Sequence, residues 1–295
     1  MLGLYFGNYL MGKGVISQSQ FDEIMLQQQK SCAKLGLIAV AEKLLTVKQA
    51  DEINEIQRRM DKRFGDIAIE KGYLLPEEVT YLLNLQGNPY LKFVQTCSDH
   101  NILSVQELED QLEAFRIDHG FTQMDIHAFK SGDLDRILST YVTIDNPFAY
   151  ELISLAIRNM IRLVNNNLIL NKVTKAKVYS FGSLASQQMV GDQDIFVGLA
   201  CKDRELLTVA NSFAKEEFAE MDDDSFDCVC EFINCTNGLY ASKLSFDDIT
   251  LDMTPPLSYS NQTAKAKDNF YIVPMLIEDK QVDLLVTVSN QVEII

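Results

Sequence analysis

Residues 225–243 read SFDCVCEFINCTNGLYASK, a segment in which apolar side chains recur at helical spacing. At about 100° of rotation per residue, these side chains cover more than half of the surface of a helix. We therefore predict a helix from Ser225 to about Lys243 that is nearly surrounded by core. Its apolar positions are Phe226, Cys228, Val229, Phe232, Ile233, Cys235, Leu239 and Tyr240.

The same helix carries one narrow polar strip. Asp227, Glu231, Asn234 and Gly238 lie at positions i, i+4, i+7 and i+11, so they share one face. A carboxylate and an amide one turn apart can contact an incoming partner together, the first as an acceptor and the second as both donor and acceptor for a water. The alternative is that the strip faces solvent without a function, as on most amphipathic helices.

Helices and strands alternate on both sides of this helix. A long amphipathic helix follows Asp145-Asn146-Pro147, and Asp222-Asp223-Asp224 caps the helix of residues 225–243. We predict a further helix at 204–218 and strands at 173–181, 194–200, 249–253, 269–277 and 281–288, the last two joined as a hairpin through Glu278-Asp279-Lys280. Helices grouped around a largely antiparallel sheet predict an α+β fold.

The spacing Asp227-x-x-x-Glu231-x-x-Asn234, followed by Pro255-Pro256, resembles the signature of the CheC/CheX/FliY phosphatases of bacterial chemotaxis. The order of the predicted elements over roughly residues 142–290 is also similar to that family. At the matching place on the first long helix stand Glu151 and then Ser154, where the signature needs Asn. The resemblance therefore implies a CheX-like domain at 142–295 with one site, as in CheX.

The resemblance also implies a function. That family removes the phosphoryl group from the aspartyl phosphate of a response regulator, CheY above all, in two-component signalling. The receiver domain supplies Mg²⁺, so the phosphatase needs no metal or other cofactor of its own. Asn234 would orient the attacking water, Glu231 would pair with the active-site Lys of the receiver, and Asp227, Pro255 and Pro256 would support them. A homodimer of the CheX-like domain is expected, through the strand at 281–288. The rival interpretation is a non-catalytic adaptor that keeps the fold and binds receivers.

Residues 1–117 contain an internal repeat, with a period of about 29 residues. Each unit predicts a short helix, a turn at Gly14 or Gly72, and a longer helix that begins at a capping residue such as Ser104, with Glu107 at capping-box spacing. Such units bury their apolar faces by stacking on neighbours, so we predict a helical repeat module at 1–117 and a helical linker at 118–141. The units open with Tyr5-Phe6-Gly7, Lys34-Leu35-Gly36, Arg63-Phe64-Gly65 and, more weakly, Lys92-Phe93-Val94.

The spacing of the repeat resembles the MshEN domain at the N-terminus of type II secretion and pilus ATPases. Motifs of that family can bind cyclic di-GMP, with the opening Arg against a guanine. The resemblance implies Arg63, Gly65, Gly72 and Gln86 as nucleotide-binding residues. Arg opens one unit of the four, and Lys43 stands where the second unit needs its second Gly. The alternatives are a helical scaffold without a ligand and a cyclic di-GMP receptor in which the CheX-like half only dimerises.

The charge of the chain excludes several classes of partner. It has 26 basic and 42 acidic residues, a net charge of −16, which argues against nucleic acid and anionic membranes. Residues 118–295 hold 14 of the basic and 26 of the acidic residues, a net charge of −12. No apolar run reaches the roughly 18 residues of a membrane span. Six cysteines in 295 residues indicate free thiols in a reducing compartment. We therefore expect a cytoplasmic two-module signalling protein.

Overall fold

The computed structural model describes residues 2–28, 33–60, 62–166, 168–288 and 292–295, and it divides the chain into two compact units, Met1–Ile137 and Leu138–Ile295. We call these the front unit and the back unit and describe each by itself. Within the described ranges, no helix is long and apolar enough to cross a membrane.

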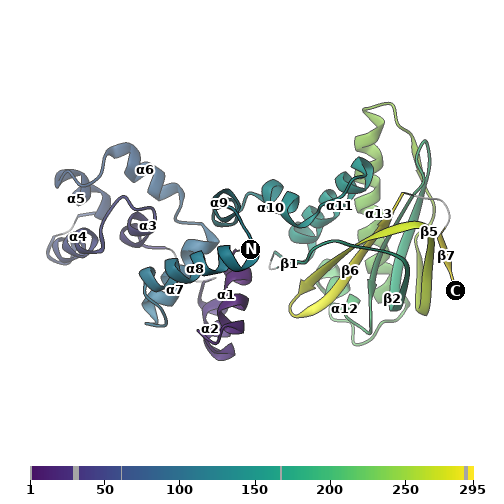
Figure 1. Ribbon diagram of the computed structural model, residues 1–295, viewed down its shortest axis with the longest axis horizontal. Helices are drawn as coiled ribbons and strands as arrows, with labels where there is room; N and C mark the ends of the chain where they lie inside the picture. The colour runs from purple at the N-terminus through teal and green to yellow at the C-terminus, as the bar shows by residue number, and fades with distance from the viewer. Residues whose placement is uncertain (1, 29–32, 61, 167, 289–291) are drawn as a thin grey trace. The chain divides into compact units, whose positions relative to one another are not determined.

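The described part of the front unit is helical (Figure 1). Each repeat unit contributes two helices. Two further helices follow the repeat, and the second of them crosses into the back unit. The helices are α1 (Leu2–Gly12), α2 (Gln18–Gln28), α3 (Leu35–Ala41), α4 (Val47–Arg59), α5 (Phe64–Glu70), α6 (Pro76–Asn84), α7 (Pro89–Asp99), α8 (Val105–His119), α9 (Gln123–Ser131) and α10 (Leu134–Tyr141).

Each turn between the first and the second helix of a repeat unit passes through a left-handed residue. Gly14, Lys43, Gly72 and Asn101 have φ angles of 70°, 59°, 69° and 51°, and each stands at the same place in its unit. The second helices of the second and fourth units then begin at side-chain caps. Thr46 caps α4 with Gln49, and Ser104 caps α8 with Glu107 in the predicted capping box. Lys43 thus adopts the backbone conformation that glycine provides in the first and third units.

Aromatic packing extends the front unit beyond residue 117. Phe121 and Phe129 lie 5.4 Å apart between ring centroids, and Phe121 lies 5.6 Å from Phe115 of α8. Phe115 in turn packs against Phe6 of α1 at 5.9 Å. We expected a helical linker at 118–141. Most of this segment belongs to the front unit, which extends to Ile137.

The back unit is an α+β domain, as predicted (Figure 1). Helices α11 and α13 pack against each other, and α13 also packs on the sheet. The strands pair antiparallel throughout, in the order β1-β5-β6-β3-β2-β4, with β7 on β5. The elements are α11 (Pro147–Asn159) with a π-helical turn at Met160–Val164, β1 (Leu168–Leu170), β2 (Thr174–Gly191), β3 (Ile195–Cys201), α12 (Leu206–Ala214), α13 (Asp223–Ser245), β4 (Leu251–Met253), β5 (Leu257–Ile277), β6 (Lys280–Thr287) and β7 (Val292–Ile294).

Two long strands close part of the sheet on itself. β2 pairs with β3, β3 with β6 and β6 with β5, and β5 returns to pair with β2 from Thr174↔Ile272 to Ser186↔Leu257. Alternate side chains of these strands point to one side and form a core there. Its buried members are Tyr179, Phe181, Leu184, Phe196, Ala200, Ala264, Ala266, Phe270, Ile272 and Leu285.

The strands differ from the prediction in length. β2 continues to Gly191, well past the predicted end at Phe181, and β5 begins at Leu257 instead of Asn269. The first half of β5 is polar and mostly exposed, so it lacks the apolar alternation by which a strand is recognised. The predicted helix at 204–218 is also shorter, at Leu206–Ala214.

The strand expected to form a dimer is not at an edge. β6 pairs with β3 on one side and with β5 on the other, so its backbone groups are already hydrogen-bonded. Among the described strands, the sheet ends at the three-residue strands β1, β4 and β7. Residues 281–288 therefore do not form the sheet edge that was expected, and the homodimer stays a prediction.

Candidate functional site

Helix α13 carries the predicted site, and local capping fixes where it begins. The Asp222 side chain accepts a hydrogen bond of 2.9 Å from the backbone N–H of Ser225, and the Ser225 hydroxyl group accepts one from the backbone N–H of Asp222. Phe226, Val229, Phe232, Ile233 and Tyr240 are buried, as predicted. Cys235 and Leu239, also predicted to be core, are exposed instead.

The polar strip lies on the accessible face of α13. Asp227 and Glu231 are exposed, and Asn234 is half-buried. Asn234 Nδ2 donates to Glu231 Oε2 at 3.3 Å, and the Cys235 thiol lies 3.3 Å from Glu231 Oε1. Burial raises the pKa of the Cys235 thiol, and the bond to Glu231 raises it further, so the thiol keeps its proton and donates it. The structure therefore brings Glu231 and Asn234 together.

Gln187 is a buried residue that binds Asn234 through a hydrogen bond. It was not identified from the sequence. Gln187 of β2 donates from Nε2 to Asn234 Oδ1 at 2.9 Å and to the backbone carbonyl of Thr254 at 2.8 Å. Its Oε1 accepts from Nδ2 of Asn237 at 2.9 Å. Gln187 and Asn237 are only 3% and 0% exposed, so this amide network is buried.

The two prolines of the signature lie close to this network. Thr254 precedes Pro255, and it is tied to β2 because its backbone N–H donates to Gln188 O at 2.9 Å. Pro255 is exposed, Pro256 is half-buried, and both lie between β4 and β5. The prolines therefore directly follow the residue whose carbonyl accepts from Gln187.

The opposite side of α13 is anchored on α11. Tyr240 donates its hydroxyl proton to the Phe148 carbonyl at 3.0 Å, and Lys243 pairs with Glu151 at 3.0 Å. Ser154, at the place where a second signature would need Asn, is buried. Glu151 is therefore engaged with α13 rather than with a second Asn.

Three of the four nucleotide-binding candidates of the front unit line one cavity. Arg63, Gly65 and Gln86 surround a space of about 400 Å³ together with Lys34 and Gly36 from the preceding opener. Gly72 lies apart, in the left-handed turn. Gln86 donates to the Ala33 carbonyl at 3.2 Å, so it also connects two repeat units.

Glycines in this repeat have a packing reason of their own. A Cβ on Gly65 would lie 2.7 Å from Val79 Cγ1, and one on Gly7 would overlap the Phe21 ring. In both pairs the glycine belongs to the first helix of a repeat unit and its neighbour to the second helix of the same unit. The glycines therefore permit close helix packing whether or not a ligand binds.

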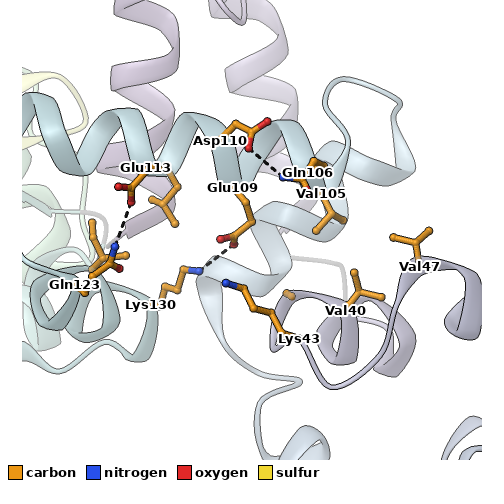
Figure 2. Close-up of a pocket in the computed structure, with 13 residues that line it drawn as sticks. Val40, Lys43, Val47, Val105, Gln106, Glu109, Asp110, Glu113, Gln123 and Lys130 are labelled. Atoms are coloured by element: carbon orange, nitrogen blue, oxygen red, sulfur yellow. Dashed lines mark hydrogen bonds and ion pairs between the residues drawn. The ribbon is translucent and has the colours of Figure 1, made fainter. Parts of the chain in front are cut away.

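A second cavity of the front unit, of about 460 Å³, is lined by charged side chains of both signs (Figure 2). Lys130 pairs with Glu109 at 3.0 Å, Gln106 donates to Asp110 at 3.0 Å and Gln123 donates to Glu113 at 3.2 Å. Its carboxylates are thus already occupied by neighbours. Over the described ranges of both units, no three His, Cys, Asp or Glu side chains come together as a metal site would require.

One comparison with known proteins matches part of the back unit. Residues 183–278 match the family model described as "Chemotaxis phosphatase CheX". This range contains Gln187, Glu231, Asn234, Thr254 and both prolines. No curated protein matches the chain.

Solved structures similar to this chain cover about half of it. A CheC-like superfamily protein from Shewanella sp. PV-4 is 19% identical, with a TM-score of 0.43 over 48% of this chain and 97% of that chain. The chemotaxis protein CheX from Desulfovibrio desulfuricans is 14% identical, with a TM-score of 0.42 over 49% and 100%. A CheX–CheY–BeF₃–Mg²⁺ complex from Borrelia burgdorferi is 16% identical, with a TM-score of 0.33 over 48% and 94%. The family match identifies residues 183–278, within the back unit, as a CheX-like domain.

Proposed function

We propose that the back unit hydrolyses the aspartyl phosphate of a CheY-like receiver domain. One observation carries the proposal. Glu231 and Asn234 are hydrogen-bonded to each other on the accessible face of α13, inside the range that matches the chemotaxis phosphatase family. The carboxylate and the amide are therefore available together to a partner that approaches the helix.

The phosphatase contributes to this reaction mainly by positioning the attacking water. A water oxygen forms a bond to phosphorus while the bond from phosphorus to the aspartate oxygen breaks. The products are the free aspartate carboxylate and inorganic phosphate, which takes both hydrogens of the water and can release one of them to solvent. Mg²⁺ belongs to the receiver and offsets the charge of the phosphoryl oxygens. Asn234 Nδ2, the outward end of the carboxamide, has a second proton that it donates to the water oxygen. Holding the water in line in this way lowers the barrier through orientation.

Glu231 would bind the receiver through charge. Its carboxylate accepts hydrogen bonds from Asn234 and Cys235 and is exposed, so it can accept a further one from the active-site lysine of a receiver. The polar strip continues to Gly238, where exposed apolar side chains lie close by: Leu239 is 55% exposed, and Met253 of β4, which lies next to Gly238, is 41% exposed. Apolar surface on the same face as a charged group is typical of a site for a protein partner.

The experiment uses the full chain and receiver domains from the same cell, phosphorylated with acetyl phosphate in the presence of Mg²⁺. We expect the wild type to shorten the lifetime of the phosphorylated receiver. Asn234→Ala is expected to lower the rate about 10²–10³-fold with binding of the receiver nearly unchanged, because the contact to water acts in the transition state. Glu231→Ala is expected to weaken both binding and rate.

Asp247→Ala, which removes an exposed carboxylate just beyond α13, is the matched control and is expected to leave both quantities unchanged. If the wild type binds these receivers but does not change their lifetime, the adaptor interpretation replaces this one.

A second candidate function belongs to the front unit. The cavity lined by Arg63, Gly65 and Gln86 supports a nucleotide site of the MshEN type, because an exposed guanidinium group lies at its rim. Lys34 takes the equivalent place in the neighbouring unit. Lys binds phosphate as a point charge but cannot make the planar, bidentate contacts of Arg to a guanine. We therefore propose at most weak binding of cyclic di-GMP.

A homodimer of the back unit stays part of the proposal. Since β6 is paired on both sides, a second copy would add to a short edge such as β4. Light scattering at micromolar concentration is expected to give twice the mass of one chain, and the mass of a single chain would exclude the dimer.

A further inference from the structure

We propose that Gln187 is a positioning residue of the phosphatase site: it fixes which end of the Asn234 carboxamide faces the substrate. This inference rests on the proposed function. Gln187 does not contact the reacting atoms, because it is buried beneath Asn234 with an exposure of only 3%.

The Thr254 carbonyl determines which end of the Gln187 amide lies beside it. The backbone carbonyl of Thr254 can only accept a hydrogen bond, so the Gln187 atom that lies 2.8 Å from it must be the amide nitrogen. The other end of the same amide is then oxygen, and it accepts from Asn237 Nδ2 at 2.9 Å. The orientation of the Gln187 amide is thus determined by its surroundings.

The orientation of the Gln187 amide in turn determines the orientation of the Asn234 carboxamide. The Gln187 nitrogen also lies 2.9 Å from the inward end of the Asn234 carboxamide. A donor requires an acceptor opposite, so Asn234 turns its Oδ1 inward and its Nδ2 outward, toward Glu231 at 3.3 Å. Without Gln187, the carboxamide of Asn234 could turn over and present either end to the water.

The fixed orientation has a catalytic consequence. An Asn side chain on a helix has free rotation about its last bond unless a neighbour restrains it, and each orientation would place a different atom on the water. Gln187 removes this choice before the receiver arrives. The site is therefore preorganised, which lowers the cost of reaching the reactive geometry.

The test compares Gln187→Met with the wild type in the full chain, using phosphorylated receiver for the rate and a beryllofluoride-treated receiver for binding. We expect kcat to fall about 10²-fold. The dissociation constant is expected to stay within about twofold, because Glu231 is untouched. Gln262→Met is the matched control. Gln262 lies on β5 opposite Phe181, further along β2 from Gln187, and its substitution is expected to leave kcat unchanged.

A double-variant cycle separates positioning from a structural role. If Gln187 acts through Asn234, then Gln187→Met in the Asn234→Ala background is expected to change kcat by less than about twofold. Gln187→Glu is the second variant in case Gln187→Met does not fold. It keeps the acceptor for Asn237 and lacks the amide donor, so we expect it to lower kcat in the same way.

NMR of the wild type tests the arrangement directly: the Gln187 side-chain amide protons are expected to be protected from solvent exchange, and those of Asn234 are not. Unchanged kcat in the folded variants, losses that multiply with that of Asn234→Ala, or fast exchange at Gln187 would each overturn the inference while the proposed function stands. A wild type without phosphatase activity would overturn both.

Discussion

Asn159 of α11 donates its Nδ2 proton to Oγ1 of Thr236 on α13 at 3.1 Å, and both side chains are buried. Thr236 lies on the side of α13 that turns away from the exposed Glu231. The bond therefore restrains the rotation of α13 about its own axis, and with it the direction in which Glu231 and Asn234 point. Together with the Gln187 network, it holds α13 from two sides.

The bond between Asn159 and Thr236 is expected to contribute to stability. Thr236→Val keeps the shape of the side chain but leaves the Asn159 amide without this acceptor in a buried place. We expect the free energy of unfolding to fall by about 1–3 kcal/mol, measured by urea unfolding. Ser242→Ala, an exposed hydroxyl on the same helix, is expected to change it by less than about 0.5 kcal/mol. Equal effects of the two substitutions would contradict this interpretation.

The prediction of α13 from sequence succeeded for a physical reason. Its apolar residues repeat at helical spacing along the whole helix, and Asp222 supplies a cap, so the buried face and the polar strip follow from local pattern. Leu239 was wrongly assigned to the core because the width of the buried face depends on the neighbouring elements, which the pattern does not contain.

Gln187 could not be found in this way. It is far from Asn234 in the sequence, in the part of β2 beyond the predicted end of the strand. The sequence does show that Gln187 is a polar residue close to the apolar Leu184 and Ala185, which are buried with it. Its hydrogen-bond partners, however, lie on α13 and at Thr254, and only the folded structure places them beside β2. Long-range hydrogen bonds leave no periodic trace in a sequence.

Asp145 is expected to make the stability of the back unit depend on pH. Hydrogen bonds from Tyr271 at 2.8 Å and Lys175 at 3.0 Å lower the pKa of this carboxyl group to about 2. A lowered pKa stabilises the folded state above the unfolded value of about 4, and this contribution is lost as the pH falls from about 4 toward 2.

Asp145→Asn, which does not titrate, isolates that effect. We expect the stability advantage of the wild type over Asp145→Asn to shrink as the pH falls from about 5 to about 2, with most of the loss below about pH 4, measured by urea unfolding. Repeating the comparison in a Tyr271→Phe background is expected to give a smaller change, since the largest cause of the shift is then absent. A difference that is constant over this range would argue against the role of Asp145.

Gly65 is expected to be needed for packing between α5 and α6. In Gly65→Ala the new methyl group would lie 2.7 Å from Val79 Cγ1, so one of the two helices must move. We expect a cost of about 1–3 kcal/mol, seen as faster hydrogen exchange in α5 and α6. Gly12→Ala is the control, because nothing lies within 4 Å of a Cβ at that position. The effect of Gly65→Ala is expected to diminish in a Val79→Ala background, and loss of protection at both glycines alike would speak against specific packing.

Calorimetry with cyclic di-GMP tests nucleotide binding at the cavity lined by Arg63, Gly65 and Gln86. We expect no binding with a dissociation constant below about 1 μM, which corresponds to about −8 kcal/mol, because Arg63 supplies one planar guanidinium group where Lys34 supplies only a point charge. Lys34→Arg is expected to strengthen any binding observed, whereas Lys43→Arg, at the cavity of about 460 Å³ shown in Figure 2, is expected to have no effect. Sub-micromolar binding to the wild type that Arg63→Ala abolishes would contradict this prediction. It would mean that the cavity recognises the nucleotide with one arginine, and that the glycines serve the ligand as well as the packing of the helices.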